Sequence, residues 1–226
     1  MKKIWKIILV LGLLGVIGLV VLFAIPWGEY ESQVEKTELT NTVDTTEIDE
    51  NTPPSIDKLE GIYSGSTANG KSEIIFDVDG LKQTKGTFSS FTVSFDIQDD
   101  FESSEIEVII DAASINTENS LRDEHLQEEG FFEVLKFPKI IYKANSISYD
   151  KGVYQANGEL SLVGKTTPLT FPFKHLGGGK YKENGDAFEA FEGEFTFDRV
   201  ESGMEEDASV GNEVSITFYT ELVKSK

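Results

Sequence analysis

Residues 91–97 read FTVSFDI, a strict alternation of large apolar residues with smaller polar or charged ones. Successive side chains of a β-strand point to opposite faces of the sheet, so this pattern predicts a strand with one buried face and one wet face. Alternation of the same kind recurs in six other runs: residues 74–78, 106–110, 154–162, 169–173, 188–197 and 214–222. A break in the alternation near Ala190 and Phe191 predicts a β-bulge there.

Turn-forming residues separate these runs. They are Asp79-Gly80, Asp99-Asp100, Asp150-Lys151-Gly152, Gly164-Lys165 and Gly177-Gly178-Gly179. Many strands with short connections favour an antiparallel sandwich or barrel. The inward positions are rich in Phe and Tyr, which fits a solid aromatic core as well as a hollow barrel that accepts an apolar ligand. Periodicity alone does not choose between the two.

The N-terminus has the pattern of a membrane anchor. Residues 7–25 read IILVLGLLGVIGLVVLFAI without a charged side chain, and three lysines precede them. A helix needs about 20 apolar residues to cross a bilayer. The flanking charges place the N-terminus in the cytoplasm and the rest of the chain outside it. We predict an uncleaved, single-pass signal anchor over residues 1–27 in the cell membrane; the alternative is a cleaved signal peptide, whose apolar core is usually shorter.

Two further segments follow the predicted anchor. Residues 28–59 are rich in Glu, Asp, Thr and Asn and contain Pro53-Pro54, so they predict a disordered acidic linker. The alternating runs begin after it, and they predict one extracytoplasmic β-domain over residues 60–226.

Composition excludes several classes of function. The formal net charge is −20, which disfavours nucleic-acid binding, because phosphate contacts need a basic surface. The chain has no cysteine, so disulfides, thiolate catalysis and cysteine-based zinc sites are excluded. It also has two histidines, His125 and His175, without the spacing of a metalloprotease helix.

One segment interrupts the strands. Residues 120–132 read SLRDEHLQEEGFF, and they predict a short amphipathic helix over about 119–129. Ser120 and Asp123 have the spacing of a capping box, and Gly130 suits the end of a helix. The helix is expected to flank or plug the mouth of a barrel, fastened by the two phenylalanines that follow it.

Five ordered blocks resemble the YceI-like family. The longest is DAASINTENSLRDEHLQEEGFFEVLKFPKI, and the others lie before and after it. The blocks are residues 86–91 (GTFSSF), 111–140, 157–171 (NGELSLVGKTTPLTF), 197–204 (FDRVESGM) and 210–218 (VGNEVSITF). Together they span about residues 60–223, nearly the whole of the predicted exported domain.

The resemblance implies a fold and a function. Members are exported, generally described as polyisoprenoid-binding, and built as a lipocalin-like antiparallel barrel around a hydrophobic tunnel. The resemblance therefore implies an eight-stranded barrel that holds an amphiphile, such as a polyisoprenoid, an isoprenoid quinone or a fatty acid or amide. A bound lipid-like ligand is expected in place of a cofactor. On this basis we predict that sixteen residues line the tunnel and its mouth: Phe76, Phe91, Val93, Phe95, Val108, Arg122, His125, Leu126, Phe131, Phe132, Tyr142, Leu160, Phe171, Phe195, Arg199 and Phe218.

Two polar residues of the predicted helix have alternative roles. Arg122 could bind an anionic head group through both guanidinium branches, or form a salt bridge to Glu118 or Glu129. His125 could hydrogen-bond a polar head group, or be satisfied by a neighbouring carbonyl.

Four other residues near the helix carry structural expectations. Asp123 is expected to cap the helix, and Arg199 to be a buried ion-pair partner, with Asp123 as one candidate. Of Phe131 and Phe132, one is expected to pack in the core and the other to line the tunnel.

Three classes of function follow from the sequence. The first is a non-enzymatic binding protein for a hydrophobic chain, used for storage, transport or sequestration, with a homodimer as one arrangement. The second is a surface-displayed structural or adhesive domain with a solid core. The third is an enzyme that modifies a lipid or a quinone, which is disfavoured because no nucleophile elbow is present. We predict no catalytic residues and no metal site.

Overall fold

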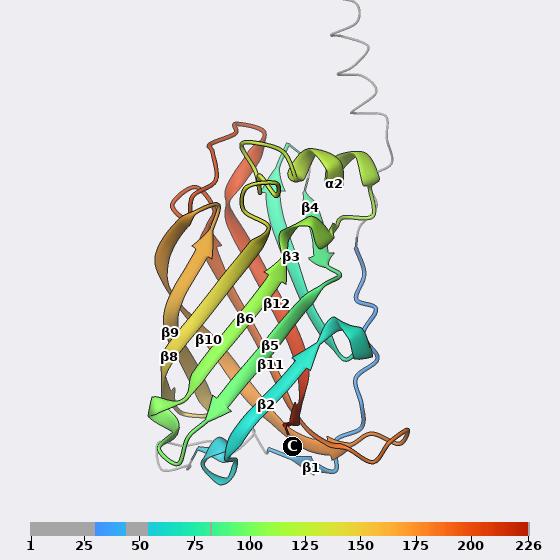
Figure 1. Ribbon diagram of the computed structural model, residues 1–226, viewed down its shortest axis with the longest axis vertical. Helices are drawn as coiled ribbons and strands as arrows, with labels where there is room; N and C mark the ends of the chain where they lie inside the picture. The colour runs from blue at the N-terminus through green and yellow to red at the C-terminus, as the bar shows by residue number, and fades with distance from the viewer. Residues whose placement is uncertain (1–29, 44–53, 82, 226) are drawn as a thin grey trace, which may run out of the picture.

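The alternating runs form β-strands of one antiparallel sheet, and eight strands of this sheet close into a barrel (Figure 1). The computed structural model describes residues 30–43, 54–81 and 83–225. Each barrel strand is hydrogen-bonded to the next, and the last returns to the first. In order around the ring they are β2 (Gly61–Ser66), β5 (Phe91–Ile97), β6 (Glu105–Asp111), β8 (Lys139–Asp150), β9 (Val153–Leu162), β10 (Lys165–Lys180), β11 (Ala187–Asp198) and β12 (Val210–Lys224). The predicted all-β, eight-stranded barrel is confirmed.

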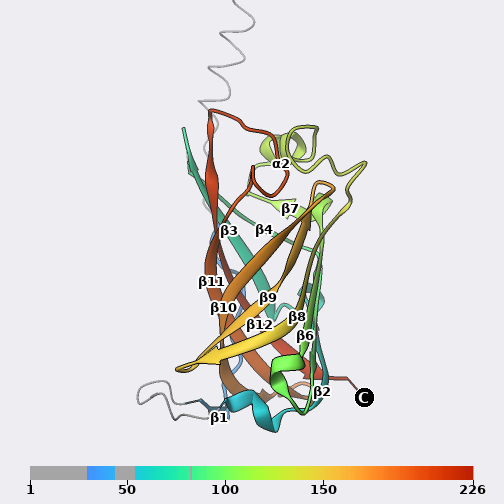
Figure 2. The same cartoon turned by 90° about the vertical axis from the view of Figure 1, so that its left-hand side faces the viewer.

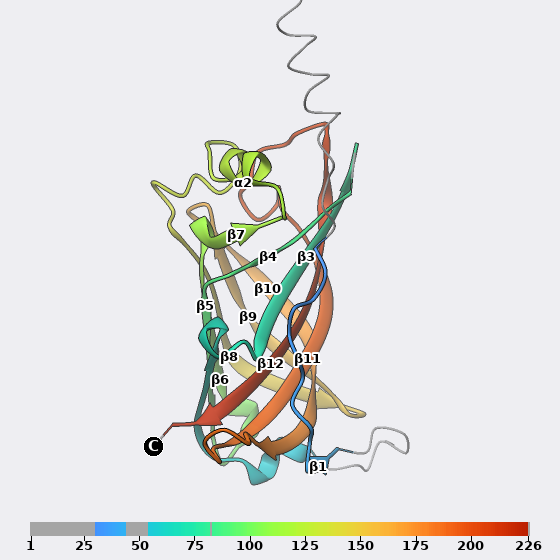
Figure 3. The ribbon, with the colours of Figure 1, turned by 90° about the vertical axis from the view of Figure 1, so that its right-hand side faces the viewer.

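Strand β12 closes the ring by pairing with three strands. Along one edge it bonds to β11, and along the other its Val210–Thr220 part bonds to β3 (Ser72–Gly80). Its last residues, Val223 and Lys224, pair with β2. Strand β3 continues outward through β4 (Thr84–Phe88) to the short β7 (Ile115–Asn116), at the end of the barrel where α2 lies (Figures 1 and 3). We call this the mouth end.

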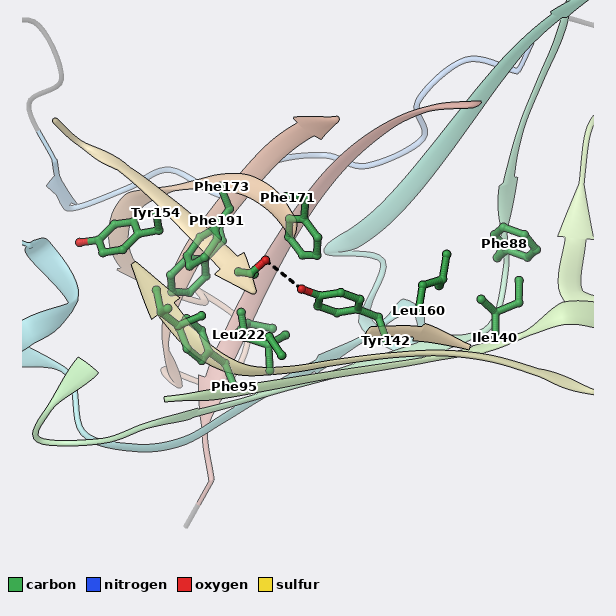
Figure 4. Packing of buried hydrophobic residues seen from close by; sticks show 14 of the residues in the cluster. Phe88, Phe95, Ile140, Tyr142, Tyr154, Leu160, Phe171, Phe173, Phe191 and Leu222 are labelled. Carbon is green, nitrogen blue, oxygen red and sulfur yellow. Dashed lines mark hydrogen bonds between the residues drawn. The ribbon is translucent and has the colours of Figure 1, made fainter. Parts of the chain in front are cut away.

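The core lies inside the barrel and consists largely of aromatic rings. Phe171 stacks on Phe195 with ring centroids 4.8 Å apart, and Tyr154 stacks on Phe173 at 5.1 Å. Figure 4 shows Phe95, Phe173, Phe191 and Tyr154 gathered toward one end, and Phe88 and Ile140 toward the other. The alternating pattern therefore points one row of side chains from each strand, many of them aromatic, into the barrel.

The predicted helix is present and shorter than expected. Helix α2 covers Ser120–Leu126, within the predicted 119–129, and lies across the mouth end (Figure 2). Its N-cap is Asn119, whose side chain accepts a hydrogen bond from the backbone N–H of Arg122 at 3.1 Å. Asp123 does not complete a capping box with Ser120; it accepts from the backbone N–H of Thr117 at 2.9 Å and so ties the helix to the preceding turn.

The bulge predicted near Ala190 and Phe191 lies opposite them, in the partner strand. The β10–β11 pairing shifts register at these two residues, between His175 and Gly177 of β10. The pairing of β11 with β12 runs without a break from Phe188 to Asp198, so β11 itself is regular there. The alternation changes in β11 because Phe188 and Ala190 are buried on the outer face of the barrel, whereas Phe191 faces inward.

The triple glycine predicted as a turn lies inside β10. A Cβ on Gly177 would lie 1.8 Å from the carbonyl oxygen of Asn41, and one on Gly179 would lie 2.9 Å from the carbonyl oxygen of Glu38. Glycine is required at these positions because another segment of backbone approaches β10 closely from outside. That segment carries β1 (Asn41–Thr42), which pairs with Gly177 and Gly178.

Residues 30–43, which we call the strap, run along the outer wall of the barrel from beside β3 to β1 (Figure 3). Tyr30 and Ser32 donate hydrogen bonds to the buried carboxylate of Glu73. The backbone N–H and the hydroxyl of Thr37 donate to Glu221 at 2.7 and 2.8 Å. Two carboxylates on the outer wall are thereby covered and satisfied.

The strap also covers an apolar patch on the outer wall. Val34 and Leu39 pack against a cluster formed by Tyr181, Phe188, Ala190 and Tyr219. These residues belong to the stretch predicted as a disordered linker, residues 28–59, and in the structure they contact the barrel wall. The linker contains few apolar residues, but each of these two meets a hydrophobic surface that the barrel already presents.

Residues 1–27, predicted as the membrane anchor, lie outside the described residues, as do residues 44–53 of the predicted linker. Within residues 30–43, 54–81 and 83–225, no helix is both long enough and apolar enough to cross a bilayer.

We predict that Tyr30→Phe lowers the free energy of unfolding by about 1.5 kcal/mol, because a buried hydrogen bond to a charged carboxylate is lost. Chemical unfolding of the full chain in mild detergent measures the effect. The neighbouring exposed residue offers a control: Glu31→Gln should stay within about 0.5 kcal/mol of the wild type. Equal stability of Tyr30→Phe and wild type would show that the strap is not held at Glu73.

We also predict that alkaline pH destabilises the barrel through its tyrosines. Burial raises the pKa of six of the seven, most strongly at Tyr30, Tyr142, Tyr181 and Tyr219. A tyrosine whose pKa is raised in the folded state contributes stability that is fully present below its unfolded pKa of about 10. This contribution is lost as the pH rises above that value.

Ultraviolet titration of tyrosinate should therefore show a late cooperative rise as the protein unfolds. Tyr142→Phe should weaken the dependence of unfolding free energy on pH above about 10. Titration of these six tyrosines near their ordinary pKa in the folded protein would contradict the prediction.

Candidate functional site

The barrel encloses a cavity of about 490 Å³. This volume falls within the roughly 300–1,000 Å³ that is usual for small-molecule sites. The cavity extends from the mouth end, where it touches α2, to an apolar floor that includes Phe173, Phe191 and Leu222. The interior is therefore hollow, although several strands point aromatic rings into it.

The walls of the cavity are almost entirely apolar. Besides the predicted positions, the lining includes apolar residues that the sequence did not single out: Ile74, Val78, Leu81, Phe88, Ile106, Ile110, Ile115, Ile140, Leu162, Leu169, Phe173, Phe191, Phe197, Met204, Val210, Val214, Ile216 and Leu222. Twelve of these eighteen occupy inward positions within the alternating runs. The six that lie outside the runs are Leu81, Phe88, Ile115, Ile140, Met204 and Val210.

All sixteen residues predicted to line the tunnel and its mouth lie on this cavity. They come from strands β3, β5, β6, β8, β9, β10, β11 and β12, from α2, and from the segments that follow α2 and β11. Their contact with a ligand stays a prediction.

The hydroxyl of Tyr142 is hydrogen-bonded to the backbone of the cavity wall. Its OH donates toward the carbonyl oxygens of Ala156 at 3.0 Å and Leu169 at 3.2 Å, and burial raises its pKa. Figure 4 shows the bond that turns this hydroxyl toward the wall. Tyr142 therefore presents its ring to the cavity, where it packs on Phe171 with centroids 4.9 Å apart.

Arg122 is half-buried at the mouth and bound to the turn before α2. Its Nε donates to the hydroxyl of Thr117 at 2.7 Å, and a second guanidinium nitrogen donates to the Thr117 carbonyl oxygen. Burial lowers the pKa of Arg122. Among its described contacts, Thr117 takes the place of the predicted partners Glu118 and Glu129.

His125 and the two phenylalanines form the inner surface of the mouth. Nδ1 of His125 lies 3.1 Å from a carboxylate oxygen of Glu128, and its ring meets Phe131 edge-on at 5.1 Å. Phe132 meets the ring of Phe88 edge-on at 5.7 Å. Phe131 is buried and Phe132 half-buried, and both lie on the cavity, so the expected division into one core residue and one lining residue is only partly seen.

Arg199 has a structural role, but with other partners than expected. It is 2% exposed and donates to the carbonyl oxygens of Gly211 at 2.8 Å, Glu205 at 2.7 Å and Val210 at 3.1 Å. Asp123, the predicted candidate, binds Thr117 instead. Arg199 thus fixes the loop between β11 and β12 where it borders the mouth.

This loop supplies two polar residues that the sequence did not indicate. Asp207 accepts hydrogen bonds from the backbone N–H of Ser209 at 2.7 Å and from its hydroxyl at 2.6 Å, which lower the pKa of Asp207. Both residues touch the cavity, as does Leu81, whose side chain is 71% exposed. The cavity therefore reaches solvent at this end.

The opposite end of the barrel is closed by a hydrogen-bonded chain of side chains. The short helix η1 (Ser55–Lys58) places Ile56 in the core with no exposed surface. The hydroxyl of Ser55 lies 2.8 Å from Nδ1 of His175, and Nε2 of His175 lies 2.8 Å from a carboxylate oxygen of Glu189. The hydroxyl of Tyr154 also accepts from the backbone N–H of Ile56 at 3.2 Å.

A serine, a histidine and a glutamate in this order have the composition of a hydrolytic triad. None of Ser55, His175 and Glu189 lies on the cavity, however, and the His175 ring stacks on Phe191 beneath the floor. The hydrogen bonds of Ser55, His175 and Glu189 therefore hold η1 against β10 and β11. We call these three residues the lock. It also keeps His175 at the opposite end from His125 in α2, so the two histidines cannot share a metal (Figure 1). Among the described residues, no group of three or more histidine and acidic side chains is placed to hold a metal ion.

Residues 66–222 match the YceI-like domain. This chain belongs to the YceI-like family. The UPF0312 protein of Yersinia pestis (strain Pestoides F) is 32% identical over 101 residues, and Protein YceI of Salmonella arizonae is 31% identical over 101 residues. Each alignment covers 44% of this chain and 53% of the relative, so the chain spans about half the length of the curated relatives it matches.

Solved structures share the fold at low identity. BcnA from Burkholderia cenocepacia has a TM-score of 0.59 and 18% identity, covering 68% of this chain and 96% of BcnA. The YceI protein of Campylobacter jejuni has a TM-score of 0.56 and 22% identity, covering 63% and 86%. A polyisoprenoid-binding domain from Saccharophagus degradans has a TM-score of 0.54 and 11% identity, covering 74% and 99%. These structures support the barrel architecture.

We predict that His175→Ala lowers the free energy of unfolding by about 2–3 kcal/mol, because it leaves a carboxylate and a hydroxyl without their common partner. The second histidine is a matched control. His125→Ala changes a side chain that is 63% exposed and should stay within about 0.5 kcal/mol of the wild type. Thermal or chemical unfolding compares the two, and equal effects would argue against the lock.

Proposed function

We propose that the chain is a binding protein for a hydrophobic, chain-like ligand held in the barrel cavity. The observation that carries this proposal is the cavity itself: about 490 Å³ of space with apolar walls, open at one end. Burial of apolar surface stabilises a complex by roughly 25 cal/mol per Å², so a long acyl or prenyl chain needs few polar contacts.

The ligand class that we propose is a polyisoprenoid, an isoprenoid quinone or a fatty acid or amide. Three arguments support it. The walls offer aromatic rings and branched aliphatic side chains to a hydrocarbon chain, and most of the polar residues that touch the cavity lie at the mouth. The structural neighbour from Saccharophagus degradans is a polyisoprenoid-binding domain. Arg122, His125, Asp207 and Ser209 surround the position of a polar end group, which is the usual arrangement of a few polar groups around an apolar pocket.

We further propose that the protein is exported and tethered to the cell membrane by residues 1–27, and that it stores, transports or sequesters its ligand. The apolar run at residues 7–25 and the lysines before it support the tether. Catalysis is not part of the proposal, because the one serine–histidine–acid chain described above lies away from the cavity. A surface domain with a solid core is disfavoured by the hollow interior.

Lipid analysis of the full chain tests the proposal. The protein is purified in mild detergent, washed, and extracted with organic solvent, and the extract is examined by mass spectrometry against a mock purification. A discrete amphiphile at near-stoichiometric amount supports a binding protein. A cavity that stays empty after incubation with prenyl and acyl lipids would overturn it.

We predict that Val93→Trp reduces the bound amphiphile at least about tenfold, because an indole in place of a small inward side chain fills part of the cavity. The neighbouring outward position provides the control: Thr92 is exposed, and Thr92→Trp should keep the wild-type lipid content. Circular dichroism shows whether both variants keep the β-fold. Unchanged lipid in folded Val93→Trp would show that the ligand does not occupy the cavity.

A further inference from the structure

We propose that the mouth end of the barrel docks onto a lipid bilayer, inserting Leu81, Leu121 and Leu135, so that ligand passes directly between the membrane and the cavity. The docking rests on the proposed membrane tether, and the passage of ligand rests on the proposed binding function. The partner surface is defined by its chemistry, a bilayer interface that accepts isolated leucine side chains.

The exposed leucines of the described chain gather at this end. Leu121 is 58% exposed on α2, Leu81 is 71% exposed in the β3–β4 connection, and Leu135 is fully exposed in the loop between α2 and β8. Two connections, β3–β4 and β7–β8, thus carry three apolar tips, and both lie at the mouth end, where the cavity opens (Figures 2 and 3). Single exposed leucines are common, but three at the rim of an apolar cavity form an interaction surface.

The strap fixes which end of the barrel can face the membrane. Tyr30 is held on the outer wall by Glu73, and from there the strap runs away from the mouth to β1 (Figure 3). Tyr30, the first described residue, therefore lies nearer the mouth than β1 does. The apolar run ends at Ile25, and the five residues from there to Tyr30 span at most about 17 Å.

A bilayer at the far end lies beyond that reach, because the strap itself uses residues 30–41 to arrive there. The far end is also closed by η1 and the Ser55–His175–Glu189 chain, whereas the cavity touches exposed Leu81 at the mouth. The short reach of the tether, the opening of the cavity and the exposed leucines all favour contact between the mouth end and the bilayer.

Charge on the rim selects the kind of bilayer. Glu124, Glu128 and Glu129 are exposed on and after α2, and Lys136 is exposed beside Leu135. An acidic rim repels anionic lipid, so insertion of the leucines, and not charge attraction, must hold the mouth in place. Zwitterionic phosphatidylcholine is therefore the appropriate probe, and added phosphatidylglycerol should weaken the contact at low salt.

Fluorescence quenching by lipid tests the docking in the full chain. The chain has no cysteine, so Leu121→Cys, Leu135→Cys and Ile62→Cys each create a single labelling site. Ile62 is the matched control: it is 47% exposed, and its carbonyl accepts from Ser225 near the C-terminus, at the end opposite α2 (Figure 1). Each labelled protein is reconstituted in phosphatidylcholine vesicles with and without a lipid that carries a nitroxide on its acyl chain.

We expect at least about threefold stronger quenching at positions 121 and 135 than at position 62, because inserted apolar side chains reach the acyl boundary. Leu135→Asp should reduce quenching of a label at position 121 to the level seen at 62, while Ile62→Asp should leave it unchanged. Similar quenching at all three positions, or stronger quenching at 62, would overturn the proposal. Quenching that depends on the amount of protein per vesicle and not on the nitroxide lipid would also overturn the proposal, because it would indicate contact with a second copy of the protein.

The outcomes separate this proposal from the binding function. Bound amphiphile without preferential quenching at the mouth would reject the docking alone. Preferential quenching with a cavity that stays empty would reject the binding function and leave the docking surface in place.

Discussion

The cavity depends on the hydrogen bonding of β12. This strand bonds to β11 along one edge and to β3 and β2 along the other, so the eight-stranded ring has no free edge. An unpaired edge would be a template for association with another chain, and closure removes it. A ring of eight strands has an interior that side chains can just fill or that can hold one small ligand. Here the aromatic side chains stack against one another and leave a cavity of about 490 Å³ between the walls.

The interior stays apolar because its polar groups are bound by the backbone. The Tyr142 hydroxyl donates to two wall carbonyls. The Arg199 guanidinium donates to the carbonyl of Glu205 in the β11–β12 loop and to those of Val210 and Gly211 at the start of β12. Buried donors that were not satisfied in this way would cost free energy and would attract water. Satisfaction by the wall leaves the polar groups of the mouth to define where a head group belongs, which agrees with a ligand that is a chain with one polar end.

Much of the fold and of the cavity could be predicted from the sequence, because period-two alternation reports which side chains share a face. Phe91, Val93 and Phe95 were assigned inward on this basis, and they line the cavity. The strap could not be predicted in this way. Thr37 lies 184 residues from its partner Glu221, and the composition around it is that of a flexible linker. The lock of Ser55, His175 and Glu189 was missed for the same reason, because each residue is unremarkable until the barrel brings them together.

The strap also changes where this protein, as an independently folding unit, begins. The family match starts at residue 66, yet the outer wall is completed by residues that precede it by more than one strand. A gene fusion or recombination event that cut at the family boundary would remove Val34 and Leu39 from the cluster of Tyr181, Phe188 and Tyr219. Glu73 and Glu221 would also lose the hydrogen bonds that the strap donates to them. The heritable module is therefore the barrel together with its strap, and any transplant of this domain onto another tether must begin no later than Tyr30.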